Sequence, residues 1–287
     1  SSIIDYGSAI WGHISFSCIE AVQNRASRYF LGLGSHAPNR AVQGDVGWKL
    51  QEDRQMKCVI NQWLRMCNMK NDKLCKKVFS WCVMKASLGV KSRYAKTLHF
   101  LNQNGFQSLC NVNNNTNFND IKDELDDVLY GISNEKWLTD VNVLYSKTGE
   151  GKNKLRTYKH FKKKVETEHY VLLNIRKKYR RALSMFRAGV APINIELLRY
   201  GVNKKTEEER FCIFCNNTIE TECHVLIKCP VYDDIRNELY NNIPDLSFFN
   251  INDEHKLYYL LSKKDIVYNV ARACFYILDR RKILTYI

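Results

Sequence analysis

The chain has 287 residues, of which 45% are hydrophobic and 12% aromatic, a composition that excludes a disordered tail and allows roughly two folded domains. Its net charge of +14 comes largely from residues 152–187, where 13 Lys and Arg residues stand against Glu166 and Glu168. No run of about 18 apolar residues occurs, so we expect no membrane-spanning helix. The sequence lacks an initiator Met and opens inside an apolar stretch, and we therefore expect it to be a piece of a longer polypeptide.

Apolar residues recur at helical spacing through nearly the whole chain, which predicts a mainly α fold. In chain order this spacing predicts a helix over 19–30, a turn-rich connection over 38–47, and helices over 51–70, 78–83 and 94–101. Six Asn residues between positions 111 and 119 predict a loop and a candidate domain boundary. Asp120 and Ser133 are the predicted N-caps of two further helices.

The segment 152–187 is the most basic part of the chain, and its apolar residues again recur at helical spacing. The pairs Arg176/Arg180 and Lys177/Arg181 are spaced i,i+4, so like charges lie on one face and cost a few tenths of a kcal/mol each. A polyanion along that face would make the interaction favourable; the alternative is a solvated face that binds nothing. We predict that nucleic acid contacts Lys152, Lys154, Arg156, Lys159, Lys162, Lys163, Lys164, Arg176, Lys177, Lys178, Arg180, Arg181 and Arg187.

The 11 cysteines fall into two groups. Seven are scattered within helical patterns and are predicted to be small buried residues in a reducing compartment, which favours an intracellular location, nuclear or cytoplasmic. These seven are Cys18, Cys58, Cys67, Cys75, Cys82, Cys110 and Cys274. The other four lie between residues 212 and 229.

Cys212, Cys215, His224 and Cys229 form the pattern C-x2-C-x8-H-x4-C. Three thiolates and one imidazole suit a tetrahedral Zn²⁺ ion, and two Cys separated by two residues can reach it from one tight turn. A regular helix would turn through about 500° between His224 and Cys229 and separate them. Because the residue before a proline avoids the helical region, Pro230 is expected to break the helix at Cys229 and to begin the next one.

Other interpretations of these residues remain open: buried cysteines without a metal, or a disulfide between Cys212 and Cys215. Cys223 adjoins His224 and could compete as a ligand, but adjacent residues seldom both reach one metal, so we expect it to pack or to remain a spare thiol. With four protein ligands the predicted single zinc site is closed, and it is therefore structural rather than catalytic.

Tyr232-Asp233-Asp234 has the look of the paired carboxylates that hold metals in polymerases. It directly follows Pro230, however, and is expected at a helix N-terminus, where the macrodipole favours Asp. No phosphate-binding, zinc-protease or serine-hydrolase motif is present. We therefore expect no enzyme active site in this chain.

Several short motifs follow one another along the chain: Tyr6-Gly7-Ser8-Ala9-Ile10-Trp11-Gly12, Ala37-Pro38-Asn39-Arg40-Ala41-Val42-Gln43-Gly44-Asp45-Val46-Gly47, Leu155-Arg156-Thr157-Tyr158, Ile195-Glu196 with Arg199-Tyr200, and the segments around the four predicted zinc ligands. The last of these contain Glu208-Glu209-Arg210, Glu220-x-Glu222 and Pro230-x-Tyr232. In this order the motifs resemble the region after the polymerase core in the reverse transcriptases of non-long-terminal-repeat retrotransposons.

The resemblance implies a thumb-like helical region over residues 1–110, a helical region carrying the basic segment over 111–205, a CCHC zinc-knuckle module over 206–240, and C-terminal helices over 241–287. It also implies that a parent protein is an RNA-directed DNA polymerase, while this part binds template RNA or target DNA. Two alternatives stay open: a zinc-stabilised module whose basic face docks an acidic protein, and an inactive relic of a retroelement.

Overall fold

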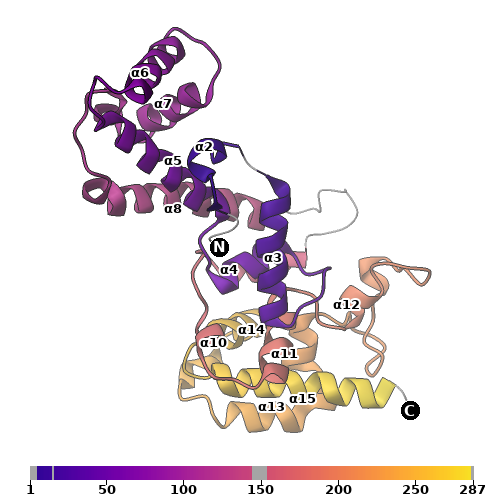
Figure 1. Ribbon diagram of the computed structural model, residues 1–287. Helices are drawn as coiled ribbons and strands as arrows, with labels where there is room; N and C mark the ends of the chain where they lie inside the picture. The colour runs from indigo at the N-terminus through magenta and orange to yellow at the C-terminus, as the bar shows by residue number, and fades with distance from the viewer. Residues whose placement is uncertain (1–4, 15, 144–153, 286–287) are drawn as a thin grey trace. The chain divides into compact units, whose positions relative to one another are not determined.

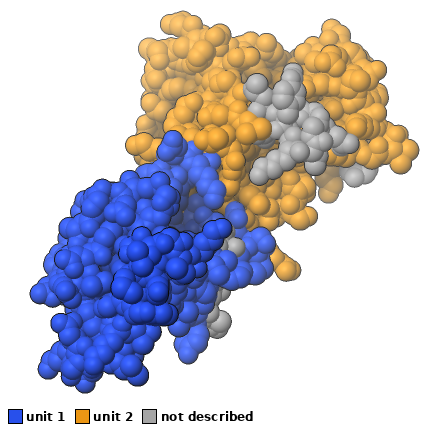
Figure 2. Space-filling view, turned by 90° about the horizontal axis from the view of Figure 1, so that it is seen from above, with its two compact units in different colours: residues 1–23, 49–136 blue, residues 24–48, 137–287 orange. Residues whose placement is uncertain are grey.

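The computed structural model describes residues 5–14, 16–143 and 154–285, and the chain forms two compact units (Figure 1 and Figure 2). Unit 1 comprises residues 1–23 and 49–136, and unit 2 comprises residues 24–48 and 137–287. The described residues are mainly helical and contain no strand, as the periodicity predicts. None of the described helices combines the length and the apolar character that crossing a bilayer requires.

Unit 1 is built around the predicted helix that begins near residue 51. Its elements are α2 (Ser8–Trp11), the start of α3 (Ser17–Leu31), α5 (Gln51–Cys67), α6 (Leu74–Ser87), α7 (Arg93–Gln103), the 3-10 helix η1 (Gln107–Cys110) and most of α8 (Phe118–Asn142). Ile60 and Trp63 lie on one face of α5, as the spacing predicts, and pack with Phe79 of α6 and Leu125 of α8. The indole of Trp63 donates to the carbonyl of Leu109 at 2.8 Å, so its buried polar group is paired.

Asp53 in the first turn of α5 is a destabilising charge that a substitution can remove. Burial raises its pKa to about 6, although the Ser133 hydroxyl donates to it at 2.6 Å. The folded state therefore binds the proton more tightly than the unfolded chain, and stability falls as pH rises from about 4 to about 6. We expect Asp53→Asn to stabilise unit 1 at pH 7 by about 1 kcal/mol, after solvent screening and the lost helix-dipole interaction are allowed for. The gain should shrink at pH 4 in paired thermal melts; an equal gain at both pH values would contradict this account.

Unit 2 contains the C-terminal half of the chain. Its elements are the end of α3, α4 (Asn39–Val46), η2 (Lys154–Arg156), α9 (Tyr158–Phe161), α10 (His169–Leu172), α11 (Lys177–Arg187), α12 (Asn194–Leu197), η3 (Glu207–Glu209), η4 (His224–Lys228), η5 (Pro230–Tyr232), α13 (Asp233–Tyr240), η6 (Leu246–Asn250), α14 (Asp253–Ser262) and α15 (Val267–Thr285). The long helix α15 packs against α11, α13 and α14. This packing forms one core, to which Phe186 of α11 and Cys274 of α15 belong.

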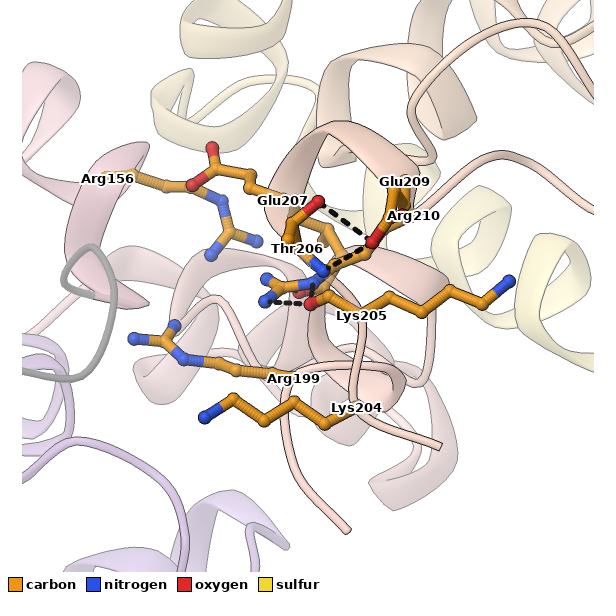
Figure 3. A pocket seen from close by; sticks show the side chains of 9 residues that line it. Arg156, Arg199, Lys204, Lys205, Thr206, Glu207, Glu209 and Arg210 are labelled. Atoms are coloured by element: carbon orange, nitrogen blue, oxygen red, sulfur yellow. Dashed lines mark hydrogen bonds between the residues drawn. The ribbon is translucent and has the colours of Figure 1, made fainter. Parts of the chain in front are cut away.

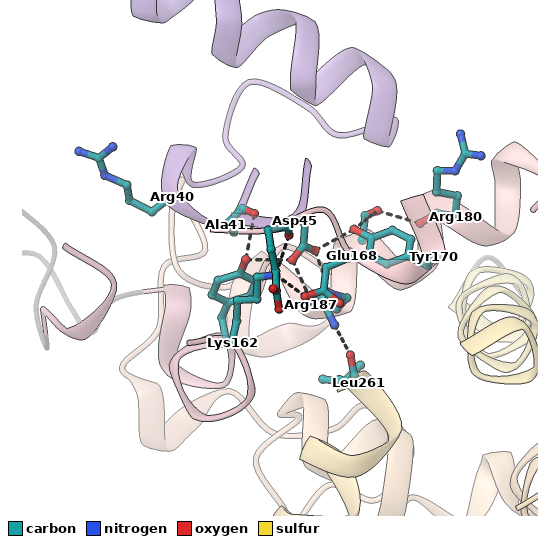
Figure 4. A network of polar contacts seen from close by, with 12 residues as sticks. Arg40, Ala41, Asp45, Lys162, Glu168, Tyr170, Arg180, Arg187 and Leu261 are labelled. Carbon is teal, nitrogen blue, oxygen red and sulfur yellow. Dashed lines mark hydrogen bonds and ion pairs between the residues drawn. The ribbon is translucent and has the colours of Figure 1, made fainter. Parts of the chain in front are cut away.

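A buried polar network joins three distant segments of unit 2 (Figure 4). The guanidinium of Arg187 donates to both carboxylate oxygens of Asp45, at 2.8 and 2.7 Å. The hydroxyls of Tyr158 and Tyr170 donate to the same carboxylate at 2.9 and 2.8 Å. Asp45 and Arg187 are both 2% exposed, and Arg187 also donates to the carbonyl of Leu261. Every oxygen of the buried carboxylate is thus paired, which is the condition for burying a charge without a large penalty.

The glycines around Asp45 allow this close packing. A side chain at Gly44 would collide with Trp137 and Tyr158, and Gly47 adopts a left-handed conformation (φ 64°) against the backbone of Glu166 and Thr167. The Gly44-Asp45-x-Gly47 stretch is therefore a packing element of unit 2. The carboxylate of Asp45 is hydrogen-bonded to side chains within unit 2.

The structure corrects several local predictions. Residues 38–47 are not a turn-rich connection, because α4 covers Asn39–Val46, with Gly44 inside the helix and Gly47 at its end. Ser133 does not begin a helix, since α8 runs continuously from Phe118 to Asn142. Within the basic segment, the spacing of the apolar residues predicts helices throughout. The described residues instead form short helices separated by extended residues, and the longest of these helices is α11.

The unit boundaries differ from the predicted order of parts. The Asn-rich stretch 111–119 lies inside unit 1, where Val112 and Phe118 pack against its core. Segments 24–48 and 137–287 combine into one unit, although more than 80 residues separate them. Two of the seven scattered cysteines are also exposed, namely Cys18 and Cys75, so the prediction that they are buried is wrong.

Candidate functional site

The first two predicted metal ligands lie in a tight turn of unit 2. Phe211 and Ile219 pair as an isolated antiparallel bridge, and the amide of Cys212 donates to the carbonyl of Thr218 at 2.8 Å. The amide of Asn216 donates back to the carbonyl of Cys212 at 2.8 Å, with Asn216 in the left-handed region (φ 59°), which Asn tolerates better than most residues. The turn brings Cys212 and Cys215 together.

The other two ligands lie at the ends of one wide helical turn. Residues His224–Lys228 form a π-helix, and the amide of Cys229 donates to the carbonyl of His224 at 2.7 Å. This i→i+5 hydrogen bond wraps five residues into roughly one turn, so that His224 and Cys229 can face the same side. Cys229 itself is extended (φ −62°, ψ 119°), and Pro230 begins the next helix. The predicted break at Pro230 is confirmed. The sequence did not predict the π-helix that precedes it.

The ligand atoms of Cys212, Cys215, His224 and Cys229 all lie within 4.8 Å of one another, so this group could hold a metal ion. The sulfur of Cys229 is 4.0 Å from that of Cys212 and 3.8 Å from that of Cys215. For a metal–sulfur bond of about 2.3 Å, the edge of a tetrahedron is about 3.8 Å. These two sulfur–sulfur distances are far longer than the roughly 2.05 Å of a disulfide, and all four cysteines of this segment are free.

The environment of the group suits metal ligands. His224 is 4% exposed, and neither of its ring nitrogens has a hydrogen-bond partner among the described residues. A buried polar group without a partner is rare, and a metal ion would supply the missing interaction. Burial lowers the pKa of His224, which favours the neutral imidazole that binds metals. Burial also raises the pKa of the Cys229 thiol to about 12, so metal binding there would release a proton.

Cys223 does not join the four-residue group. Its side chain is half-buried against the core of unit 2, and burial raises the pKa of its thiol to about 11. Cys223 therefore packs against the core as a free thiol, as its sequence position predicts.

A second buried network anchors this turn to the rest of unit 2. Glu220 is fully buried, and Arg281 of α15 donates to its two oxygens at 3.0 and 2.8 Å. Glu220 also accepts from the amide of Asn194, whose side chain in turn accepts from Arg281 at 3.1 Å. No spacing in the sequence connects Glu220 with Arg281, because 61 positions separate them. The only signal was its place in the Glu220-x-Glu222 motif.

The predicted basic residues separate into two classes. Lys152 lies outside the described residues. Four others are tied to acids: Arg187 to Asp45, Lys162 to Glu168, Lys154 to Glu196 at 2.7 Å and Arg156 to Glu222. Lys162 and Arg187 are also buried, at 3% and 2% exposure. The charges of Lys162 and Arg187 are enclosed within the fold, so the prediction that these two residues face a ligand is wrong.

The remaining basic residues face outward. Lys163, Lys164, Arg176, Lys177, Lys178 and Arg181 are exposed, and Lys159 and Arg180 are half-buried. Arg176 caps α11, and the next cations lie along its first turns, while Tyr179, Leu183 and Phe186 of the same helix are buried. We call the outward side chains of Arg176, Lys177, Lys178, Arg180 and Arg181 the α11 face. The helix α11 itself contains no acidic residue.

A basic pocket of about 420 Å³ lies in the segment that leads into Cys212 (Figure 3). Its walls include Arg156, Arg199, Lys204, Lys205 and Arg210. Arg210 donates to the carbonyl of Ile195 at 3.0 Å and to that of Lys205 at 2.9 Å. The guanidinium of Arg210 therefore links the chain around Lys205 to that around Ile195. It also lines the pocket, so the residue that holds this segment contributes to the positive charge of the pocket. Arg156 is among the basic residues predicted to contact nucleic acid, and Arg199 and Arg210 belong to the motifs described above, but no pattern in the sequence predicts Lys204 and Lys205.

The paired carboxylates Asp233 and Asp234 lie in the first turn of α13, as expected. Arg236 donates to Asp233, and Arg280 donates to both oxygens of Asp234, which lowers the pKa of Asp234 to about 2. Both carboxylates thus have cationic partners inside the chain. Their arrangement supports the prediction of a helix N-terminus.

Comparisons with protein-family models, with curated proteins and with solved structures find no match to this chain.

Proposed function

We propose that this chain binds nucleic acid as the post-polymerase part of a retrotransposon reverse transcriptase, with one structural Zn²⁺ ion holding its knuckle. The observation that carries the proposal is the closed group of Cys212, Cys215, His224 and Cys229 in the same unit as the α11 face. The order of motifs along the sequence supports the family assignment. The role requires no active site in this chain.

Zinc is the metal that this donor set favours. Three thiolates and one imidazole are soft and borderline ligands, and sulfur atoms about 4 Å apart fit tetrahedral coordination. With four protein ligands, the ion would have no position for water or substrate. Zinc would therefore supply rigidity, keeping the turn and the π-helix together against α15.

The α11 face is the part of the basic segment that can meet a polyanion. Four of its five cations are exposed and Arg180 is half-buried, and all five lie on α11 or at its start, whereas Lys162 and Arg187 are paired with acids inside the fold. Cations fixed at helical spacing repel one another, and phosphates laid along them would remove this repulsion. A protein with acidic side chains is the competing partner.

Charge reversal on the α11 face tests the proposal. We expect Lys177→Glu with Arg181→Glu to weaken binding to RNA or DNA by at least about tenfold near 0.1 M salt, and to lower the slope of log Kd against log salt by about 2. Fluorescence anisotropy with a labelled oligonucleotide measures both quantities. Lys162 is left unchanged, because its substitution would disturb the fold.

The matched control is Lys91→Glu with Lys122→Glu, which changes the net charge equally at exposed positions of unit 1. This control should bind almost as the unchanged chain does. If both double variants bind equally well, the α11 face is not the interface. If the chain binds no oligonucleotide but captures an acidic protein after nuclease treatment, the function is protein interaction.

A further inference from the structure

Exposed aromatic rings stand beside the cations of the α11 face. Tyr29 of α3 is 78% exposed, and the ammonium of Lys177 lies 5.5 Å from its ring centre. The next residue, Phe30, is 39% exposed, and the guanidinium of Arg180 lies 5.0 Å from its ring centre. Tyr29, Phe30 and α11 all belong to unit 2, and a Cβ at Gly32 of the same segment would crowd the side chain of Arg181.

A second set of rings lies on the other side of α11, on α15. The ammonium of Lys178 is 4.4 Å from the ring centre of Phe275, and Arg272 is 5.5 Å from that of Tyr276. Tyr268 and Tyr276 are 47% and 37% exposed. Cations and accessible rings thus alternate across α3, α11 and α15.

The exposed ring of Tyr29 is not explained by packing, whereas Phe275 packs against the core of unit 2. A cation beside an exposed ring contributes less to stability than full burial of a ring would. The core of unit 2 is complete without Tyr29, which keeps most of its surface in water. An exposed ring with a mobile cation close by is, however, what a nucleobase and its phosphate need, since the base can stack on the ring while the cation meets the phosphate.

The pairing state of the nucleic acid decides whether such rings are useful. In a duplex each base is already stacked on its neighbours, and its flat faces are hidden from a protein surface. An unpaired strand exposes those faces, and stacking on aromatic side chains is tolerant of sequence. A site for duplex phosphates alone would need the cations and not the rings.

We infer that the α11 face binds an unpaired strand, with bases stacked on Tyr29 and the neighbouring rings and phosphates on Lys177, Arg180 and Arg181. The inference rests on the proposed function and names its ligand: a single-stranded segment of RNA or DNA. Phosphate contact requires Lys177 to leave the Tyr29 ring, which its long side chain allows.

The test compares one sequence in two forms, an unpaired oligonucleotide of about 20 nucleotides and its blunt duplex, each as RNA and as DNA. The whole chain is used with zinc bound, and anisotropy gives the Kd. We expect the unpaired form to bind at least about tenfold more tightly than the duplex. Tyr29→Ala should weaken binding of the unpaired form by about tenfold and leave duplex binding unchanged.

Two controls separate stacking from structure. Tyr29→Phe keeps the ring and should bind as the unchanged chain does, and Tyr130→Ala removes an exposed Tyr of unit 1 and should have no effect. Equal affinity for both forms, with Tyr29→Ala neutral, would overturn this inference but leave nucleic-acid binding standing. Absence of binding to either form would overturn both.

Discussion

Replacing one ligand of the candidate metal centre is expected to abolish metal binding and destabilise unit 2. The unchanged chain should hold one equivalent of zinc, and Cys212→Ser or His224→Ala should hold close to none. A structural zinc site contributes on the order of 10 kcal/mol, so the midpoint of thermal unfolding should fall by roughly 10 °C or more. Metal content by elemental analysis, with melts before and after chelation, measures both effects.

Cys223→Ser is the matched control, because Cys223 adjoins His224 but lies outside the ligand group. This variant should keep its zinc and melt near the unchanged chain. If Cys223→Ser loses the metal while Cys212→Ser retains it, the ligand assignment is wrong. If the unchanged chain, with all four ligands in place, binds no zinc, the structural role of zinc in the proposed function is wrong.

Arg187→Met is expected to destabilise unit 2 by about 3–5 kcal/mol, because it leaves the carboxylate of Asp45 buried without its cation. Burial alone would raise the pKa of Asp45, but Arg187 outweighs that effect and holds this pKa below its ordinary value. The stability that Asp45 contributes is therefore present above pH 4 or so, and it is lost as pH falls through the lowered pKa. Chemical denaturation at neutral pH measures the loss.

Arg181→Met is the control for this change, because it removes an exposed Arg from the same helix. It should change stability by less than about 0.5 kcal/mol. The double variant Asp45→Leu with Arg187→Met should recover part of the loss, since no unpaired charge remains. An Arg187→Met chain as stable as the unchanged protein would show that the buried pair is not needed.

The group of Cys212, Cys215, His224 and Cys229 was predictable because the spacing that brings its members together is local. Cys212 and Cys215 lie in one turn, and Pro230 sets the backbone of Cys229 whatever else surrounds it. Helices with a strong apolar face, such as α5, were predictable for the same reason. The helix α4 was missed, because Gly44 and Gly47 are typical of turns and only packing against Trp137 and Tyr158 explains Gly44 inside a helix.

The basic segment shows what residue spacing along the sequence does not determine. Its sequence determined that 13 cations fall within 152–187, and that some lie together on one face of a helix. Only the tertiary structure decided which of them are free to meet a ligand. Arg187 and Asp45 lie 142 residues apart, so no spacing rule connects them. The same holds for Tyr29 beside Lys177. Charge is a property of each residue, whereas its availability depends on which distant groups the fold brings against it.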